Sequence, residues 1–78
     1  MPTLVRAVFP GTFDPITLGH EDMLRRACAL FGEVIVAVAM AHHKKTLFTL
    51  DARLSITRQA LADMPKVRVE PFEGLVTE

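Results

Sequence analysis

The segment Glu33–Met40, with the sequence EVIVAVAM, constrains the fold of this chain more than any other. After Glu33 every residue in it is apolar, and valine, alanine and isoleucine supply most of the positions. A strand that is apolar on both of its faces is typical of a parallel sheet covered by helices. A transmembrane helix needs about 20 apolar residues, so this run is far too short to be one. The segment therefore predicts a buried parallel strand.

Two further strands and two helices are predicted around this segment. The strands are Thr3–Phe9, which is mainly apolar, and Lys66–Phe72, which alternates valines with charges. The helices are Leu18–Phe31 and Leu50–Met64, where apolar residues recur every three or four positions. This β-α-β-α-β order predicts an α/β fold with a Rossmann-like parallel sheet, the first half of a doubly wound fold. We expect three layers, with helices on both faces of the sheet.

Residues that favour turns and caps set the expected ends of these elements. Pro10 and Gly11 are expected to stop the first strand, and Gly32 to cap the first helix at its C-terminus. Thr49 is expected at the N-cap of the second helix, which Pro65 then ends. The polar stretches between the elements are predicted loops.

The length and charge of the chain exclude several classes of protein. Its 78 residues suffice for one small domain, and 9 basic side chains balance 9 acidic ones. A neutral chain argues against a nucleic-acid partner, since such modules present a basic face. Cys28 is the one cysteine, which excludes an internal disulfide, and we expect it to be a small buried hydrophobe. With no signal-peptide or membrane-span pattern, we predict a cytoplasmic protein without membrane contact.

Two predicted loops follow the carboxyl ends of neighbouring strands, where ligands bind in open α/β sheets. The first, Pro10–Thr17, leads into a helix that starts with Gly19 and His20 in its first turn. A helix N-terminus binds phosphate through its free N–H groups and its dipole. The second loop, Ala41–Thr49, carries two histidines and two lysines. Together the loops predict a phosphate-binding site at one edge of the sheet.

A resemblance becomes specific at the first of these loops. The sequence PGTFDPITLGH, Pro10–His20, resembles the signature of the T/H-x-G-H nucleotidylyltransferases. Within that superfamily the chain is most similar to the bacterial phosphopantetheine adenylyltransferases. Pro10, the threonine at position 17 and the stretch KKTLFTLDAR, Lys44–Arg53, carry this closer match. The similarity runs along the whole chain.

The resemblance implies transfer of AMP from ATP to 4′-phosphopantetheine, giving dephospho-coenzyme A and pyrophosphate. It implies catalytic roles for His20 and Lys44, and ATP contacts for Thr12, Phe13 and His20. Thr12, Lys44 and Val76 are expected to contact phosphopantetheine. Mg²⁺ is expected to arrive with ATP, without metal ligands from the protein, and a homo-oligomer is expected.

The resemblance also implies a domain of about twice this length, the usual size for a doubly wound fold. We therefore expect residues 1–78 to be the truncated N-terminal half of one nucleotidylyltransferase domain, inactive on its own. One alternative is a non-catalytic fragment that binds phosphate weakly or self-associates. Another is a related adenylyl- or cytidylyltransferase with a different acceptor.

Other polar and sulfur-containing residues receive structural interpretations. Asp14 is expected to form a turn bond within its loop. His42 and His43 are expected in a solvated loop, because adjacent side chains diverge and no third metal ligand is near in sequence. Met23 and Met64 are expected in the core. Solvated helix faces or ion pairs are expected for four arginines: Arg25, Arg26, Arg53 and Arg58.

Overall fold

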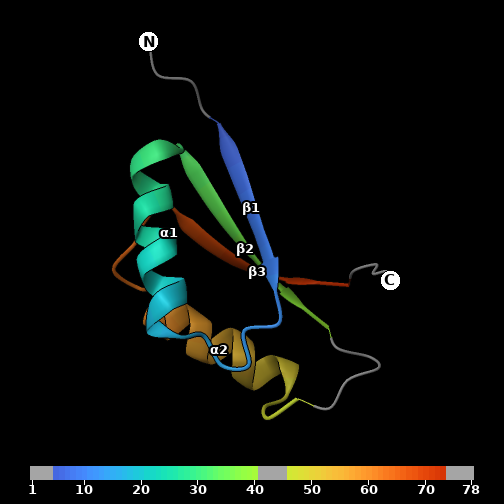
Figure 1. The fold of residues 1–78 in the computed structure, drawn as a ribbon. Helices are drawn as coiled ribbons and strands as arrows, with labels where there is room; N and C mark the ends of the chain where they lie inside the picture. Colours follow the sequence, from blue (N-terminus) through green and yellow to red (C-terminus); the bar gives the residue numbers. More distant parts are fainter. Residues whose placement is uncertain (1–4, 41–45, 74–78) are drawn as a thin grey trace.

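The fold consists of a three-stranded parallel sheet and two helices (Figure 1). The computed structural model describes residues 5–40 and 46–73. Its elements are β1 (Arg6–Gly11), α1 (Leu18–Leu30), β2 (Glu33–Ala39), α2 (Leu50–Ala60) and β3 (Val67–Phe72). The strands lie in the order β1-β2-β3, and both pairs are parallel. The predicted β-α-β-α-β arrangement is confirmed.

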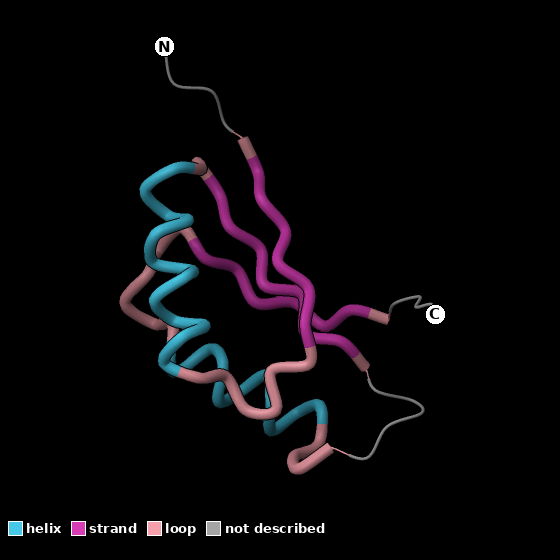
Figure 2. Tube along the Cα trace, in the orientation of Figure 1, coloured by secondary structure: helices cyan, strands magenta, loops and turns pink. Residues whose placement is uncertain are grey.

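Both helices pack on the same face of the sheet, so the described residues form two layers (Figure 2). Val34, Val36 and Val38 point to this face from β2 and are fully buried. They share one core with side chains from α1 and α2, including Leu24 and Leu54. Successive crossovers of one hand that add strands in one direction place their helices on one face. The expectation of three layers is therefore wrong for this part of the chain.

The opposite face of the sheet carries a row of charges across the three strands. Glu33 in β2 accepts from Arg6 in β1 at 2.7 Å and from Arg68 in β3 at 3.2 Å. Arg68 also pairs with Glu70 at 3.3 Å. On the same face Val8 is 56% exposed. This face is therefore polar at the amino ends of the strands and partly apolar further along.

Three predicted boundaries are wrong. α2 ends at Ala60, and its C-cap Leu61 leaves the helical conformation, so Pro65 does not end this helix. β1 continues through Pro10 and Gly11, because β1 is an edge strand of this sheet and edges tolerate proline. α1 ends at the C-cap Phe31, and no described glycine has a positive φ, so Gly32 forms no left-handed cap. Instead the Lys66 ammonium donates to the carbonyl oxygens of Cys28 (2.9 Å) and Phe31 (3.5 Å), which satisfies the end of the helix.

The sulfur-containing residues divide between core and surface. Met64 is buried as predicted, whereas Met23 is 42% exposed and faces a surface groove. Cys28 is half-buried and packs against the core as a free thiol. Within the described ranges, neither helix is long and apolar enough to span a membrane.

The row of charges predicts an acid-sensitive contribution to stability. Hydrogen bonds from Arg6 and then Arg68 hold the pKa of Glu33 below its ordinary value of 4.5. A lowered pKa means that the contribution is present above pH 4.5 and is lost as the pH falls through the folded-state value. We expect Glu33→Gln to melt at a lower temperature than the parent chain at neutral pH, and the gap to close on acidification.

Thermal melts followed by circular dichroism between neutral pH and pH 3 measure the difference in melting temperature. Asp63→Asn is the matched control, because it removes a single exposed ion pair with Arg25 at 3.4 Å. Melting curves of the parent chain and Glu33→Gln that stay parallel down to pH 3 would contradict the prediction.

The free edge of β1 predicts self-association. In the part of the chain that the structure describes, β1 pairs only with β2, and an unpaired strand edge is a template for another strand. We expect oligomers in sedimentation velocity at micromolar concentration and more monomer for Val8→Lys. Leu47→Lys, a change at a 79% exposed position outside the sheet, is the control. A parent chain that sediments as a monomer would contradict this expectation.

Candidate functional site

The candidate site lies where β1 and β2 end, at the same edge of the sheet (Figure 1). Gly11, the last residue of β1, pairs with Val38, close to the last residue of β2. The chain then runs from β1 to α1 through residues 12–17, and it enters α2 through residues 46–49. The topology therefore brings these two segments together, as the sequence predicted.

Asp14 joins the two segments directly. Its carboxylate accepts the backbone N–H of Leu47 at 2.5 Å and that of Phe48 at 2.9 Å. Asp14 has a structural role, but the predicted turn bond within its own loop is wrong, because both bonds reach across to another segment. A carboxylate that accepts two backbone N–H groups makes charge-assisted bonds, which are stronger than neutral ones. Asp14 therefore fixes the separation of the two segments.

Phe13 holds the centre of the β1–α1 segment in an unusual conformation. Its φ is 51°, which residues with a Cβ rarely adopt, and its side chain is 5% exposed. A Cβ on Gly11 would lie 2.9 Å from the Phe13 ring, so glycine is needed there for the ring to pack. The Phe13 ring also meets the His20 ring edge-on, with 5.0 Å between centroids. Phe13 therefore links the strained backbone to His20.

Thr17 fixes the orientation of the His20 ring. The Thr17 hydroxyl accepts the His20 backbone N–H at 3.2 Å, and the Thr17 backbone N–H donates to His20 Nδ1 at 3.0 Å. These two reciprocal bonds form a capping box with histidine at the third helical position. Because Nδ1 accepts a hydrogen bond, the ring proton belongs on Nε2. The ring therefore presents an N–H donor on the side away from Thr17.

The start of α1 also leaves space beside His20. A Cβ on Gly19 would lie 3.6 Å from the Thr17 hydroxyl, an ordinary contact, so packing within the protein does not require glycine there. A glycine that the protein does not need for itself is consistent with close approach of a ligand. The helix dipole and the first N–H groups of α1 favour an anion at this point.

Arg53 is the site residue that the sequence interpretation missed. It was expected in solvent or in an ion pair, but it is 2% exposed and donates to three backbone carbonyl oxygens. A signal was present, since Arg53 lies three residues after Leu50 and four before Thr57, on the apolar stripe of α2. By contrast, Arg25 and Arg26 form the expected surface ion pairs.

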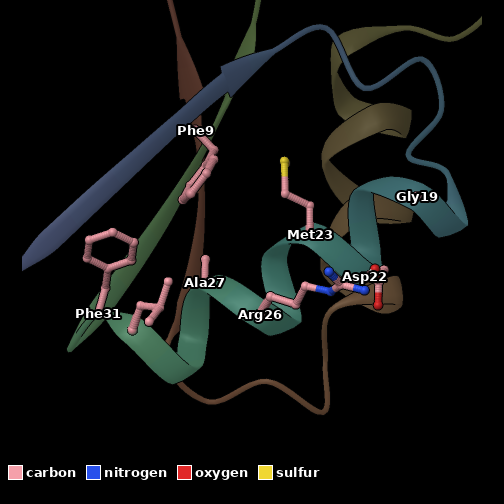
Figure 3. Close-up of a pocket in the computed structure, with 8 residues that line it drawn as sticks. Phe9, Gly19, Asp22, Met23, Arg26, Ala27 and Phe31 are labelled. Atoms are coloured by element: carbon pink, nitrogen blue, oxygen red, sulfur yellow. Dashed lines mark ion pairs between the residues drawn. The ribbon is translucent and has the colours of Figure 1, made fainter.

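A groove of about 340 Å³ runs along α1 beside β1 and reaches the candidate site at Gly19 (Figure 3). Its apolar lining comes from Phe9, Met23, Ala27, Leu30 and Phe31. The charged side chains in its lining, Asp22 and Arg26, pair with each other at 3.1 Å. The groove therefore adds apolar surface next to the site, and its two charged side chains form an ion pair with each other.

Several predicted site residues can be placed and others cannot. Thr12 is half-buried beside Phe13, and its carbonyl oxygen accepts from Arg53 at 2.9 Å. Lys44 and Val76 lie outside the described residues, as do His42 and His43. Among residues 5–40 and 46–73, no three histidine, cysteine or carboxylate side chains are grouped so that they could hold a metal ion. The described part of the site thus offers hydrogen-bond donors to an anion.

Comparison with known proteins gives a family, close relatives and a common fold. Residues 8–78 match the cytidylyltransferase-like family. The chain is 74% identical to a phosphopantetheine adenylyltransferase of Acidovorax sp. (strain JS42), over 95% of the chain and 45% of that protein. It is 55% identical to the phosphopantetheine adenylyltransferase of Thiobacillus denitrificans, over 96% of the chain and 47% of that protein. The chain thus spans just under half the length of these curated relatives.

A solved structure from Francisella tularensis shares the fold. It is a bifunctional NMN adenylyltransferase/ADP ribose pyrophosphatase complexed with AMP and a manganese ion. The TM-score is 0.76 at 23% identity, over 92% of this chain and 23% of that one. At this identity the likeness establishes the arrangement of strands and helices and nothing finer.

The bonds around His20 predict which ring nitrogen carries the proton. We expect the neutral imidazole to be the Nε2–H form, because the Thr17 N–H occupies Nδ1. Long-range ¹H–¹⁵N spectra of the labelled chain distinguish the two ring nitrogens, and His42 and His43 supply reference signals in the same spectrum. A His20 ring in the Nδ1–H form would show that the capping box is not formed in solution.

Proposed function

The chain belongs to the cytidylyltransferase-like family, and from this premise we propose that it acts in the transfer of AMP from ATP to 4′-phosphopantetheine. The products are dephospho-coenzyme A and pyrophosphate, so the reaction belongs to coenzyme A biosynthesis, and we propose that it takes place in the cytoplasm. The observation that carries the proposal is the His20 ring fixed at the start of α1, whose Nε2 donor has no partner within residues 5–40 and 46–73 and could bond a phosphate oxygen. The names of the relatives supply the acceptor.

In this reaction the protein has to align the two substrates and stabilise negative charge. A phosphate oxygen of 4′-phosphopantetheine attacks the α-phosphorus of ATP and forms a new P–O bond. The bond from the α-phosphorus to the oxygen that bridges to the β-phosphorus breaks, and pyrophosphate leaves with the electron pair. The nucleophile is already ionised near neutral pH, so no general base is required. Catalysis then rests on alignment of the reactants and stabilisation of the charge on the transferred phosphoryl group.

The described residues are suited to these two tasks. His20 would donate from Nε2 to the ATP phosphates, and the N-terminus of α1 would add the attraction of its dipole. The Thr12 and Phe13 backbone would border the nucleotide, and the Thr12 hydroxyl would contact both substrates. Lys44 and Val76, which lie outside the described residues, are proposed for the phosphate and the arm of phosphopantetheine. The residues together form the phosphate-binding part of a nucleotidylyltransferase domain.

A protein-held metal centre does not fit the described residues, which group no three metal-binding side chains. We therefore treat Mg²⁺ as part of the substrate, chelated by the oxygens of ATP. The residues of this chain then act on the nucleotide itself, through hydrogen bonds and the dipole of α1.

Calorimetric titration of the chain with Mg·ATP tests the proposed contact of His20. A hydrogen bond to a charged group contributes about 1.5–3 kcal/mol, so His20→Ala is expected to weaken binding by about tenfold or more. Gln59→Ala, a change at an exposed position of α2, is the control and is expected to bind like the parent chain. Melting temperatures identify any general loss of fold. Equal affinity of the parent chain and His20→Ala would contradict the role of His20.

The acceptor is tested separately, because related transferases share the ATP side. We expect 4′-phosphopantetheine to bind in the presence of a non-hydrolysable ATP analogue, and nicotinamide mononucleotide not to bind. Calorimetry with each acceptor in turn makes the comparison. Binding of the mononucleotide in place of phosphopantetheine would assign a related transferase, and binding of neither would leave a non-catalytic fragment.

A further inference from the structure

We infer that Arg53 is a positioning residue of this site, whose guanidinium holds the Thr12–Phe13 backbone against the segment that leads into α2. The inference deepens the proposed function and rests on it, because it names what keeps the two parts of that site in register. Arg53 itself is buried and is not expected to touch either substrate.

Three stretches that are distant in sequence meet at the Arg53 side chain. Its Nη1 donates to the carbonyl oxygens of Thr12 at 2.9 Å and Ala39 at 2.7 Å, and its Nε donates to that of Phe48 at 3.2 Å. These carbonyls belong to the loop after β1, to the end of β2 and to the residue before the N-cap of α2. The side chain is 2% exposed, so water competes little for these bonds.

Arg53 and Asp14 together clamp one peptide segment from both sides. The Asp14 carboxylate accepts the Phe48 N–H at 2.9 Å, while Arg53 donates to the Phe48 carbonyl. Asp14 is itself part of the β1–α1 loop, and Arg53 bonds the Thr12 carbonyl in the same loop. The loop is therefore attached to the start of α2 at two points, which restricts both sliding and rotation.

The bond to Thr12 acts at the point where the loop is most strained. The peptide that follows the Thr12 carbonyl leads into Phe13, whose φ of 51° is unfavourable for a residue with a Cβ. Fixing the carbonyl fixes that peptide plane, and the Phe13 ring then stands 5.0 Å from the His20 ring. Substitution of Arg53 is thus expected to shift the His20 ring, because the Thr12 carbonyl and the Phe13 ring connect the two residues.

An arginine suits this position because two different nitrogens of one side chain bond carbonyls of three separate segments. The guanidinium offers several N–H donors in a rigid planar fork, whereas the lysine ammonium is a single point on a flexible stem. Arg53→Lys therefore keeps the positive charge but loses the planar set of N–H donors, and Arg53→Met loses both the charge and the donors. Arg58, on the same helix, donates to the carbonyl of Val69 in β3 at 2.8 Å, away from the loop. Arg58→Met is the matched control.

Amide hydrogen exchange without any ligand gives the first test. In both Arg53 variants we expect the amides of Phe13, Leu47 and Phe48 to exchange about tenfold faster than in the parent chain. The amide of Val36 in the central strand should change by less than about twofold, and Arg58→Met should leave the loop amides unchanged. Faster exchange by the same factor in every element would overturn the inference and leave Arg53 with a general role in stability.

Affinity for Mg·ATP gives the second test, with a readout that lost stability alone does not move. We expect the dissociation constant to rise about tenfold for Arg53→Met and in the same direction for Arg53→Lys, because a preorganised loop binds without an ordering cost. Arg58→Met should bind like the parent chain. Unchanged affinity in folded Arg53 variants would overturn the inference. If the parent chain binds no nucleotide, the proposed function fails, and the exchange experiment still decides whether Arg53 positions the loop.

If neither Arg53 variant folds, the role of Arg53 can be tested in the parent chain. The Nε–H of Arg53 bonds the Phe48 carbonyl, and ¹⁵N spectra can follow the Nε–H groups of arginines. We expect its signal to shift as Mg·ATP is added, together with the amide signals of Phe13 and Gly19. A stationary Arg53 signal beside shifting loop signals would overturn the inference.

Discussion

The bonds from the buried Arg53 guanidinium to three backbone carbonyls are the interaction on which the candidate site depends. Two neighbouring parallel strands end at one edge of the sheet, and the described residues 12–17 and 46–49 beside this edge form no helix or strand that would hold them together. Arg53 in α2 joins the loop after β1, the end of β2 and the residue before Thr49. A buried charge is costly unless its hydrogen bonds are satisfied, and these carbonyls satisfy it.

The consequences extend from the backbone to one functional side chain. Asp14 fastens the loop after β1 to Phe48, and the Phe13 ring fills the space that Gly11 leaves open. Thr17 then bonds His20 at both its backbone and its ring, so that Nδ1 is occupied and Nε2 has no hydrogen-bond partner among the described residues. Each contact is local, but together they orient a hydrogen-bond donor at the start of a helix, where the dipole favours an anion. This combination suits a bound phosphate group.

The sequence predicted the elements well because the dominant signals were local. The apolar run of β2 and the helical stripe of α2 each reflect one local pattern, and both elements are found, although α2 ends at Ala60 and not at Met64. The failures involve relations between elements. Pro10 was expected to stop β1, but an edge strand tolerates it. Arg53 was assigned by residue type, although its place on the apolar stripe indicated burial. For His20, the motif predicted the residue, but the ring orientation depends on three-dimensional contacts with Thr17 and Phe13.

We propose that the sheet edge where β1 and β2 end is an anion site built around His20. The most direct test is a titration of the ¹⁵N-labelled chain with pyrophosphate, with amide shifts followed residue by residue. We expect amide shifts only in the loop after β1 and the first turn of α1, Thr12 and Gly19 included. The amide signals of Glu33 and Val67 at the opposite edge should stay unchanged. Shifts that gather at the opposite edge, or no shifts at millimolar pyrophosphate, would contradict this proposal.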